Sequence, residues 1–230
     1  MIRPRTRIGR FALSLLILVA SACQPAASAS ERTVQAPAAT RIASEGPKLQ
    51  TAVFAGGCFC GVEGLFSHMK GVTGVLTGYH GGTPASANYD RVSGGNTGHA
   101  EAVRVTYDPA KVRYDQLLQV FFSVVADPTL LNRQGPDTGT QYRSALVPLS
   151  AEQNAVAAAY LGQLRKAGLW KAPIVTRIEA YQRFHAAETY HQDFMAKNPQ
   201  HPYIRAWDDA KVAALKRQFP ALYQARFTTG

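Results

Sequence analysis

The sequence predicts an α+β fold, a two-layer sandwich in which helices cover a mixed, largely antiparallel sheet. Two observations support this class. Segments with strand and helix patterns follow one another in the order β-α-β-β-α-β-α-β-α-α, which suits such a sandwich better than a doubly wound parallel sheet. The 230 residues are 46% hydrophobic and 17% charged, so the chain holds enough apolar material for one globular domain.

The first half of the domain begins with a strand and a helix joined by glycines. Residues 49–57 are a short apolar strand ending in two glycines, and residues 58–69 carry apolar side chains at helical spacing. Residues 71–79 and 100–108 alternate as strands do. The apolar face of this last strand consists of Val103, Val105 and Tyr107.

The second half continues with helices and strands in turn. A helix at 113–125 stops before Asp127 and Pro128, and Ser150 caps the helix that follows a strand at 141–149. The remaining predicted elements are a helix at 151–168, a strand at 173–180, and helices at 184–198 and 208–219. Together these elements describe a ferredoxin-like arrangement with elaborations.

The N-terminal residues have the pattern of an export signal. Residues 1–22 combine four arginines, a short apolar run and small residues, so they predict a secretory signal peptide. Cys23 stands where a bacterial lipoprotein signal carries its lipidated cysteine, and ordinary cleavage nearby is the alternative. Residues 23–48 are rich in Ala, Ser and Pro and predict a flexible tether before a folded domain at 49–230. We expect an exported, periplasmic protein that touches a membrane only through a lipid on Cys23.

The net charge does not indicate a nucleic-acid partner. The formal charge is +10, but four of the positive charges belong to the arginines of the signal segment. The remaining +6 is spread along the chain without a cluster of Lys and Arg, so we expect no nucleic-acid binding.

Three stretches carry side chains suited to chemistry. In "GGCFCGVEGLF", Cys58 follows two glycines at a predicted helix start, where the helix dipole favours the thiolate. The loop "ADPTLLNRQGPDTGTQYRS" is polar and lacks a regular period, and loops of this length are often functional. Tyr89 and Glu101 flank a glycine-rich turn. The alternative is structural: a buried cysteine, packed tyrosines and a surface acid.

These motifs, with "GYHGG", "YDRVSGGNTGHAEAVRVTYDP" and "FHAAETYHQDFMAKNP", resemble the successive motifs of the A-type peptide methionine sulfoxide reductases. They follow the family's order and span residues 52–198. The resemblance implies that residues 49–230 are the catalytic domain and that the enzyme reduces methionine-S-sulfoxide, free or in proteins, through a cysteine sulfenic acid. It further implies no bound cofactor, an external thioredoxin-like thiol reductant (dithiothreitol in vitro) and a role in repairing oxidised exported proteins. We expect a monomer.

The resemblance also implies a role for each matching residue. A sulfoxide sulfur becomes electrophilic when its oxygen takes a proton, so the site needs an acid that stays protonated near neutral pH. The implied roles are: Cys58 as nucleophile, Glu101 as acid, Tyr89 and Tyr142 as hydroxyl donors to the oxygen, Asp137 as support for the pocket, and Phe59 as an aromatic wall for the substrate methyl group.

Cys60 departs from the family, because tryptophan usually stands there as a second wall. Three outcomes stay open. Cys60 resolves the sulfenic acid of Cys58 as a disulfide across one residue, an external thiol reduces that acid directly, or Cys60 is structural in an impaired homologue that only binds methionine sulfoxide. A metal site in "CFC" is not expected, because paired zinc ligands usually have a longer spacer.

Overall fold

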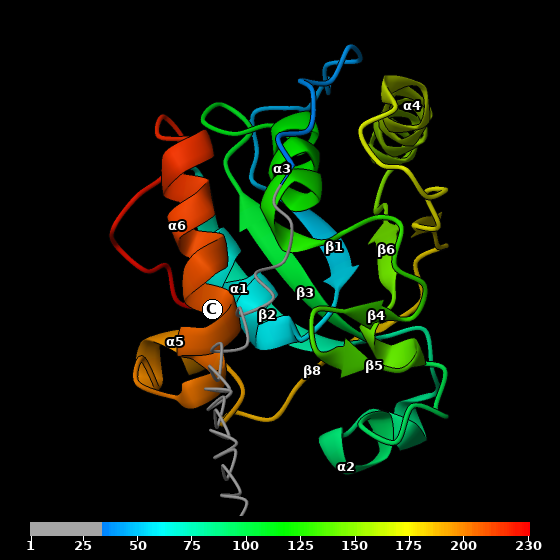
Figure 1. Ribbon diagram of the computed structural model, residues 1–230, viewed down its shortest axis with the longest axis vertical. Helices are drawn as coiled ribbons and strands as arrows, with labels where there is room; N and C mark the ends of the chain where they lie inside the picture. Colours follow the sequence, from blue (N-terminus) through cyan, green and yellow to red (C-terminus); the bar gives the residue numbers. More distant parts are fainter. Residues whose placement is uncertain (1–33) are drawn as a thin grey trace, which may run out of the picture.

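A six-stranded sheet crosses the molecule in the computed structural model, which describes residues 34–230 (Figure 1). The strands are β1 (Gln50–Gly56), β2 (Val72–His80), β3 (Ala100–Tyr107), β6 (Ser144–Val147), β7 (Arg177–Ile178) and β8 (Phe184–Ala186). Their order is β7-β6-β1-β3-β2-β8, and every neighbouring pair is antiparallel except β6 and β7. The predicted mixed, largely antiparallel sheet is therefore confirmed.

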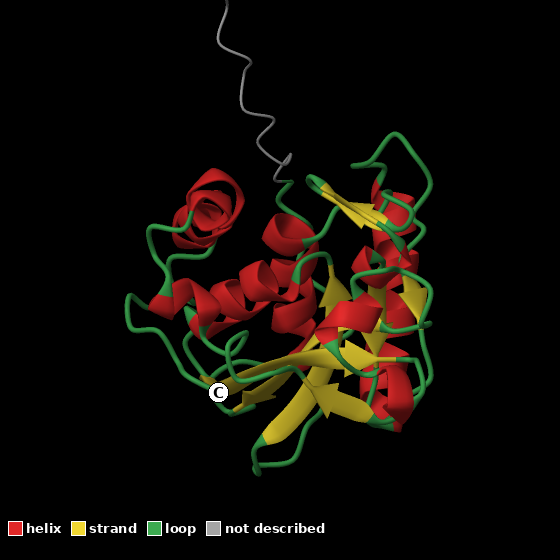
Figure 2. Ribbon diagram, turned by 90° about the horizontal axis from the view of Figure 1, so that it is seen from below, coloured by secondary structure: helices red, strands yellow, loops and turns green. Residues whose placement is uncertain are grey.

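The helices form the second layer, and Figure 2 shows most of them gathered on one side of the strands. They are α1 (Phe59–Ser67), α2 (Tyr89–Val92), α3 (Tyr114–Val120), α4 (Ala151–Ala167), α5 (Phe194–Lys197) and α6 (Asp209–Gln218). A π-helical turn at Phe121–Val125 extends α3, and another at Ile204–Asp208 leads into α6. Ser150 caps α4 as predicted, because its side chain accepts the Gln153 N–H at 3.1 Å.

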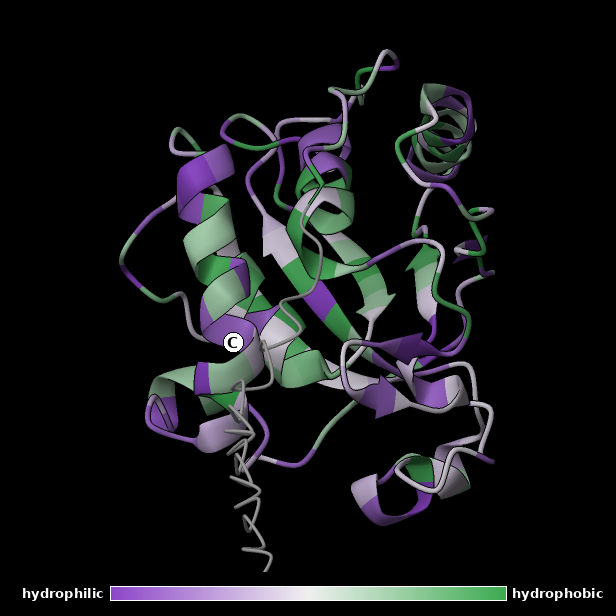
Figure 3. Ribbon diagram, viewed as in Figure 1, coloured by the Kyte–Doolittle hydropathy of each residue, from purple (hydrophilic) through white to green (hydrophobic). Residues whose placement is uncertain are grey.

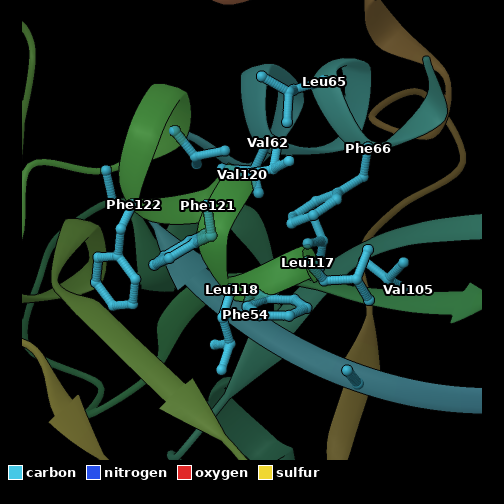
Figure 4. Packing of buried hydrophobic residues seen from close by; sticks show 14 of the residues in the cluster. Phe54, Val62, Leu65, Phe66, Val105, Leu117, Leu118, Val120, Phe121 and Phe122 are labelled. Atoms are coloured by element: carbon cyan, nitrogen blue, oxygen red, sulfur yellow. The ribbon is translucent and has the colours of Figure 1, made fainter. Parts of the chain in front are cut away.

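The core lies between the sheet and the helices. Val103, Val105 and Tyr107 are buried in the large apolar cluster beneath the helices, as the alternation predicts. In the same cluster the Phe54 ring of β1 lies 5.0 Å from the Phe66 ring and 5.4 Å from the Phe121 ring, between centroids (Figure 4). Because side chains alternate along β3, Glu101 shares the face that the helices cover.

The segment between β8 and α5 differs from the predicted helix at 184–198, and that prediction is wrong. Residues 184–186 instead pair with β2 as an edge strand, and helical structure covers only Phe194–Lys197. The Gln192 side chain explains part of the change: it accepts the Thr77 N–H at 3.0 Å and donates to the Thr77 carbonyl at 3.1 Å. These bonds occupy backbone groups of β2 and hold the intervening turns against the sheet.

Two predicted strands are shorter than expected. The strand at 173–180 is reduced to β7, and the strand at 141–149 is reduced to β6. Before β6 the chain forms a 3-10 turn at Thr140–Tyr142, and the polar loop ahead of it contains a small hairpin, β4 (Arg133–Gln134) and β5 (Asp137–Thr138). Figure 3 shows this hairpin as hydrophilic beside the apolar strands of the sheet.

Residues 34–48 pack against the domain, so this part of the predicted tether is not free. Ala36 and Ala43 are buried; the Ala36 N–H donates to Ser123 Oγ and the Ala43 N–H to Asp115 Oδ1, both at 3.0 Å. Small side chains permit this close approach, and fixed acceptors offset the lost chain entropy. The predicted signal peptide at 1–22, Cys23 and the start of the tether lie outside the described residues. No helix within 34–230 is long and apolar enough to cross a bilayer.

Candidate active site

A pocket of about 320 Å³ brings together all seven residues that the sequence singled out in the folded domain. These are Cys58, Phe59, Cys60, Tyr89, Glu101, Asp137 and Tyr142. Five residues that were not predicted complete the lining: His191, Phe194, His201, Tyr203 and Ile204. The pocket therefore joins the start of α1, the strand β3 and several loops that are far apart in the sequence.

Cys58 is the N-cap of α1, and the turn before it depends on Gly57. Gly57 has a φ of +93°, a left-handed conformation that side chains rarely adopt, and a Cβ there would lie 2.6 Å from the Cβ of Gln134. Gln134 is buried and bridges the backbone of Asp127 with two hydrogen bonds of 2.9 Å. The glycine thus lets the loop that carries Asp137 approach the cysteine closely.

Glu101 is nearly fully buried, with 2% of its surface exposed, and its Oε2 accepts the Phe59 N–H at 3.0 Å. This bond places the carboxyl group at the first turn of α1, beside Cys58. Burial raises the pKa of Glu101 to about 8, and the bond from Phe59 opposes that shift. The carboxyl group is therefore largely protonated at neutral pH and can donate a proton into the pocket.

The two tyrosines reach the pocket from short elements. Tyr89 is the first residue of α2, and Tyr142 is the last residue of the 3-10 turn at Thr140–Tyr142. Burial, followed by the nearby Glu101, raises the pKa of both phenols. Both hydroxyl groups therefore keep their protons and can act as neutral hydrogen-bond donors.

Hydrogen bonds with Glu188 and Tyr203 hold two of these pocket residues. The Tyr89 N–H donates to Glu188 Oε1 at 3.0 Å. Asp137, the first residue of β5, accepts a hydrogen bond from the Tyr203 hydroxyl. The C-terminal segment before α6 is thereby tied to the hairpin, which the sequence did not indicate.

Cys60 faces the pocket from the first turn of α1 and is 7% exposed. A hydrogen bond with Cys58, followed by burial, raises the pKa of the Cys60 thiol. Cys58 and Cys60 are both free thiols. The Cys60 side chain is therefore protonated at neutral pH and lines the same pocket as Cys58.

His191 and Phe194 form a wall that the sequence did not predict; we call this pair the 191–194 wall. The His191 ring lies 4.5 Å from the Tyr89 ring and 4.9 Å from the Phe59 ring, between centroids. Burial lowers the pKa of His191, so the imidazole is neutral at neutral pH. The only signal for this wall was its position within the stretch "FHAAETYHQDFMAKNP", which resembles a family motif.

Comparison with known proteins agrees with this site. Residues 50–222 match the model of the family described as peptide methionine sulfoxide reductase. The chain is 55% identical over 180 residues, 78% of its own length and 92% of the relative's, to "Peptide methionine sulfoxide reductase MsrA 2" of Mesorhizobium japonicum. It is 50% identical over 170 residues, 74% of its length and 79% of the relative's, to a protein with the same description from Synechocystis.

A solved structure is similar to this chain as well. The crystal structure of Mxr1 from Saccharomyces cerevisiae in reduced form is similar, with a TM-score of 0.61 and 35% sequence identity over 70% of this chain and 92% of that chain. The family match covers most of the chain, and the named relatives exceed 30% identity over more than two thirds of their length. The chain belongs to the peptide methionine sulfoxide reductase family, A type, and is a peptide-methionine (S)-S-oxide reductase.

Proposed function

We propose that Cys58 reduces methionine-S-sulfoxide, free or in proteins, by direct attack on the substrate sulfur. The observation that carries this proposal is the common pocket of Cys58, Glu101, Tyr89 and Tyr142, in which the acid is buried beside the nucleophile. A thiol nucleophile, a protonated acid and two neutral donors are the groups that sulfoxide reduction requires.

The chemical step follows from these groups. The tyrosine hydroxyls hold the sulfoxide oxygen without adding charge, and Glu101 gives that oxygen a proton. The Cys58 thiolate attacks the substrate sulfur and forms a sulfur–sulfur bond, and the protonated oxygen moves from the substrate sulfur to Cys58, which becomes a sulfenic acid. The bond between the two sulfurs breaks in the same step, and its electron pair stays on the methionine sulfur. Asp137 supports the pocket through its bond with Tyr203, and Phe59 borders the space for the methyl group.

We propose that Cys60 then resolves the sulfenic acid. Its thiol would attack the sulfur of Cys58, form a disulfide and release the oxygen as water, and an external thioredoxin-like dithiol would reduce that disulfide. The support is that the two thiols line one pocket, that Cys58 is the main cause of the raised pKa of Cys60, and that residues 34–230 contain no third cysteine. Direct reduction of the sulfenic acid by an external thiol is the competing route.

One experiment tests both steps. Purified protein is mixed with methionine-S-sulfoxide, first without reductant and then with dithiothreitol, and methionine and the thiols are measured by mass spectrometry. We expect one equivalent of methionine and a Cys58–Cys60 disulfide without reductant, continued turnover with it, and no methionine from Cys58→Ser or from the R epimer.

The other outcomes are equally informative. A Cys60→Ser variant should still release one equivalent of methionine but retain a sulfenic acid; if the wild type also retains one, the external route is correct. Binding of the sulfoxide without any methionine would contradict the proposal and identify an impaired homologue that only binds oxidised methionine.

We also infer that the enzyme acts outside the cytoplasm, where it repairs oxidised exported proteins. The support is the arginine-rich and apolar pattern of residues 1–22 and the position of Cys23. Expression of the full chain in bacteria, followed by fractionation and mass measurement, tests this. A mature chain that starts at an acylated Cys23 is the expected product, whereas an intact Met1 in the cytoplasm would contradict it.

A further inference from the structure

The structure assigns Glu63 as a positioning residue that fixes the 191–194 wall of the substrate pocket. Glu63 lies in the middle of α1, is fully buried and does not line the pocket. Its Oε1 accepts the Asp193 N–H at 2.9 Å and its Oε2 accepts the Phe194 N–H at 3.3 Å. This inference rests on the proposed use of the pocket for substrate.

The backbone that Glu63 holds needs such support. Asp193 has φ +55° and ψ +32°, a left-handed conformation that is unfavourable for a residue with a Cβ. Its N–H and that of Phe194 begin the short helix α5, where backbone donors have no partner within the helix. A carboxylate that accepts both N–H groups therefore satisfies the helix start and stabilises the turn before it.

Close packing transmits the position of Glu63 to the pocket. A Cβ at Gly64 would collide with the side chain of Met195, so α1 and α5 approach each other closely. Phe194 follows Asp193 directly and lines the pocket, and His191 is two residues earlier. A shift of the Asp193 turn would therefore move the 191–194 wall, whereas Cys58, five residues before Glu63, stays at the N-terminus of α1.

Burial of the Glu63 carboxyl group has a cost in free energy, and the hydrogen bonds that it accepts offset part of that cost. Burial raises its pKa to about 7, and the backbone donors of Asp193 and Phe194 oppose that shift. Asp193 and Lys197 are the charged neighbours that affect it, with opposite signs. An apolar side chain would avoid the burial of a carboxyl group but would leave two N–H groups of the wall without their acceptor.

Glu63→Gln tests the assignment, with Asp115→Asn as the matched control. Gln keeps the size of Glu63 but presents an NH₂ group to one of the two N–H donors. We expect KM for methionine-S-sulfoxide to rise about tenfold, the effect of one lost charged hydrogen bond, with kcat within about twofold of wild type. The alkylation rate of Cys58 by iodoacetamide without substrate should not change.

The control makes the same chemical change at another buried carboxyl group. Asp115 is 3% exposed and accepts the Ala43 N–H, outside the pocket. Asp115→Asn should lower thermal stability but leave KM unchanged. Glu63→Asp, which keeps the charge on a shorter side chain, should give an intermediate KM and serves as the test if Glu63→Gln does not fold.

The outcomes separate this inference from the proposed function. If Cys58→Ser is inactive and folded Glu63 variants keep the wild-type KM, the assignment of Glu63 is wrong and the proposed function stands. The assignment would also be wrong if Glu63→Gln and Asp115→Asn changed kcat and KM to the same extent, because Glu63 would then contribute only to general stability. Methionine formation by Cys58→Ser would instead overturn the proposed function.

Discussion

The two sides of the pocket are built in different ways. Cys58 and Cys60 lie at the start of α1, and Glu101 lies on β3, which is hydrogen-bonded on both sides, to β1 and β2. The opposite side comes from short elements and turns that individual side chains hold: Glu188 binds the Tyr89 N–H, and Tyr203 binds Asp137.

This difference predicts that substitutions on the two sides change different kinetic constants. A continuous backbone ladder fixes the strand that carries the acid, and the nucleophile stands at the start of a helix that packs on the same sheet, so their backbone positions depend little on any one side chain. The loop side depends on single hydrogen bonds, each of which can be removed by one substitution. We therefore expect loss of the acid on the sheet side to reduce kcat, and loss of a hydrogen bond that supports the loop side to raise KM.

The largest effect is expected for Glu101→Gln on the sheet side. The loss of a general acid should reduce kcat by about 10²- to 10⁴-fold while KM changes little. The pKa of about 8 also fixes the direction of the pH dependence: wild-type activity should fall as the pH rises through about 8, because the acid loses its proton.

This prediction is checked by steady-state rates of both proteins from about pH 6 to about pH 9, a range that includes that pKa. The Gln variant should lack the alkaline decline that depends on this group. A Gln variant with the wild-type rate and the same decline would show that another group protonates the oxygen. The predicted difference in kinetic effects between the two sides would then be wrong.

A smaller effect is expected for Tyr203→Phe on the loop side. This change removes the hydroxyl that donates to Asp137 but keeps the aromatic ring. We expect KM to rise by about threefold to tenfold, the effect of one hydrogen bond, with kcat nearly unchanged. Substrate titration of the initial rate measures both constants. A reduced kcat with unchanged KM would place Asp137 with the chemical groups rather than with binding.

The smallest effect on catalysis is expected outside both sides, at Glu45 in the N-terminal segment. Glu45 accepts hydrogen bonds from the Tyr107 hydroxyl and, at 3.0 Å, from the Tyr114 N–H. Glu45→Ala should lower the free energy of unfolding by about 1 kcal/mol in urea titration and leave kcat and KM unchanged. A changed KM would mean that the segment at 34–48 acts on the pocket.

Much of the site could be predicted because local patterns carry the information. The alternation of β3 determines that Glu101 shares a face with Val103 and Val105, and hence lies under the helices. The glycines before Cys58 mark a turn into a helix, and Gly57 has the left-handed φ that such a turn uses. In each case neighbouring residues decide the geometry, so a short stretch of sequence is enough.

The sequence by itself determined the class of the fold, the positions of Cys58 and Glu101, and the departure at Cys60. Only the tertiary structure decided that residues 184–186 pair with β2, that residues 34–48 pack on the domain, and that His191 and Phe194 line the pocket. The physical reason is that these features depend on which distant group accepts a given N–H. Periodicity along the chain indicates which face of an element is buried, but the partner that Glu63 provides for Asp193 exists only after α1 and α5 have packed together.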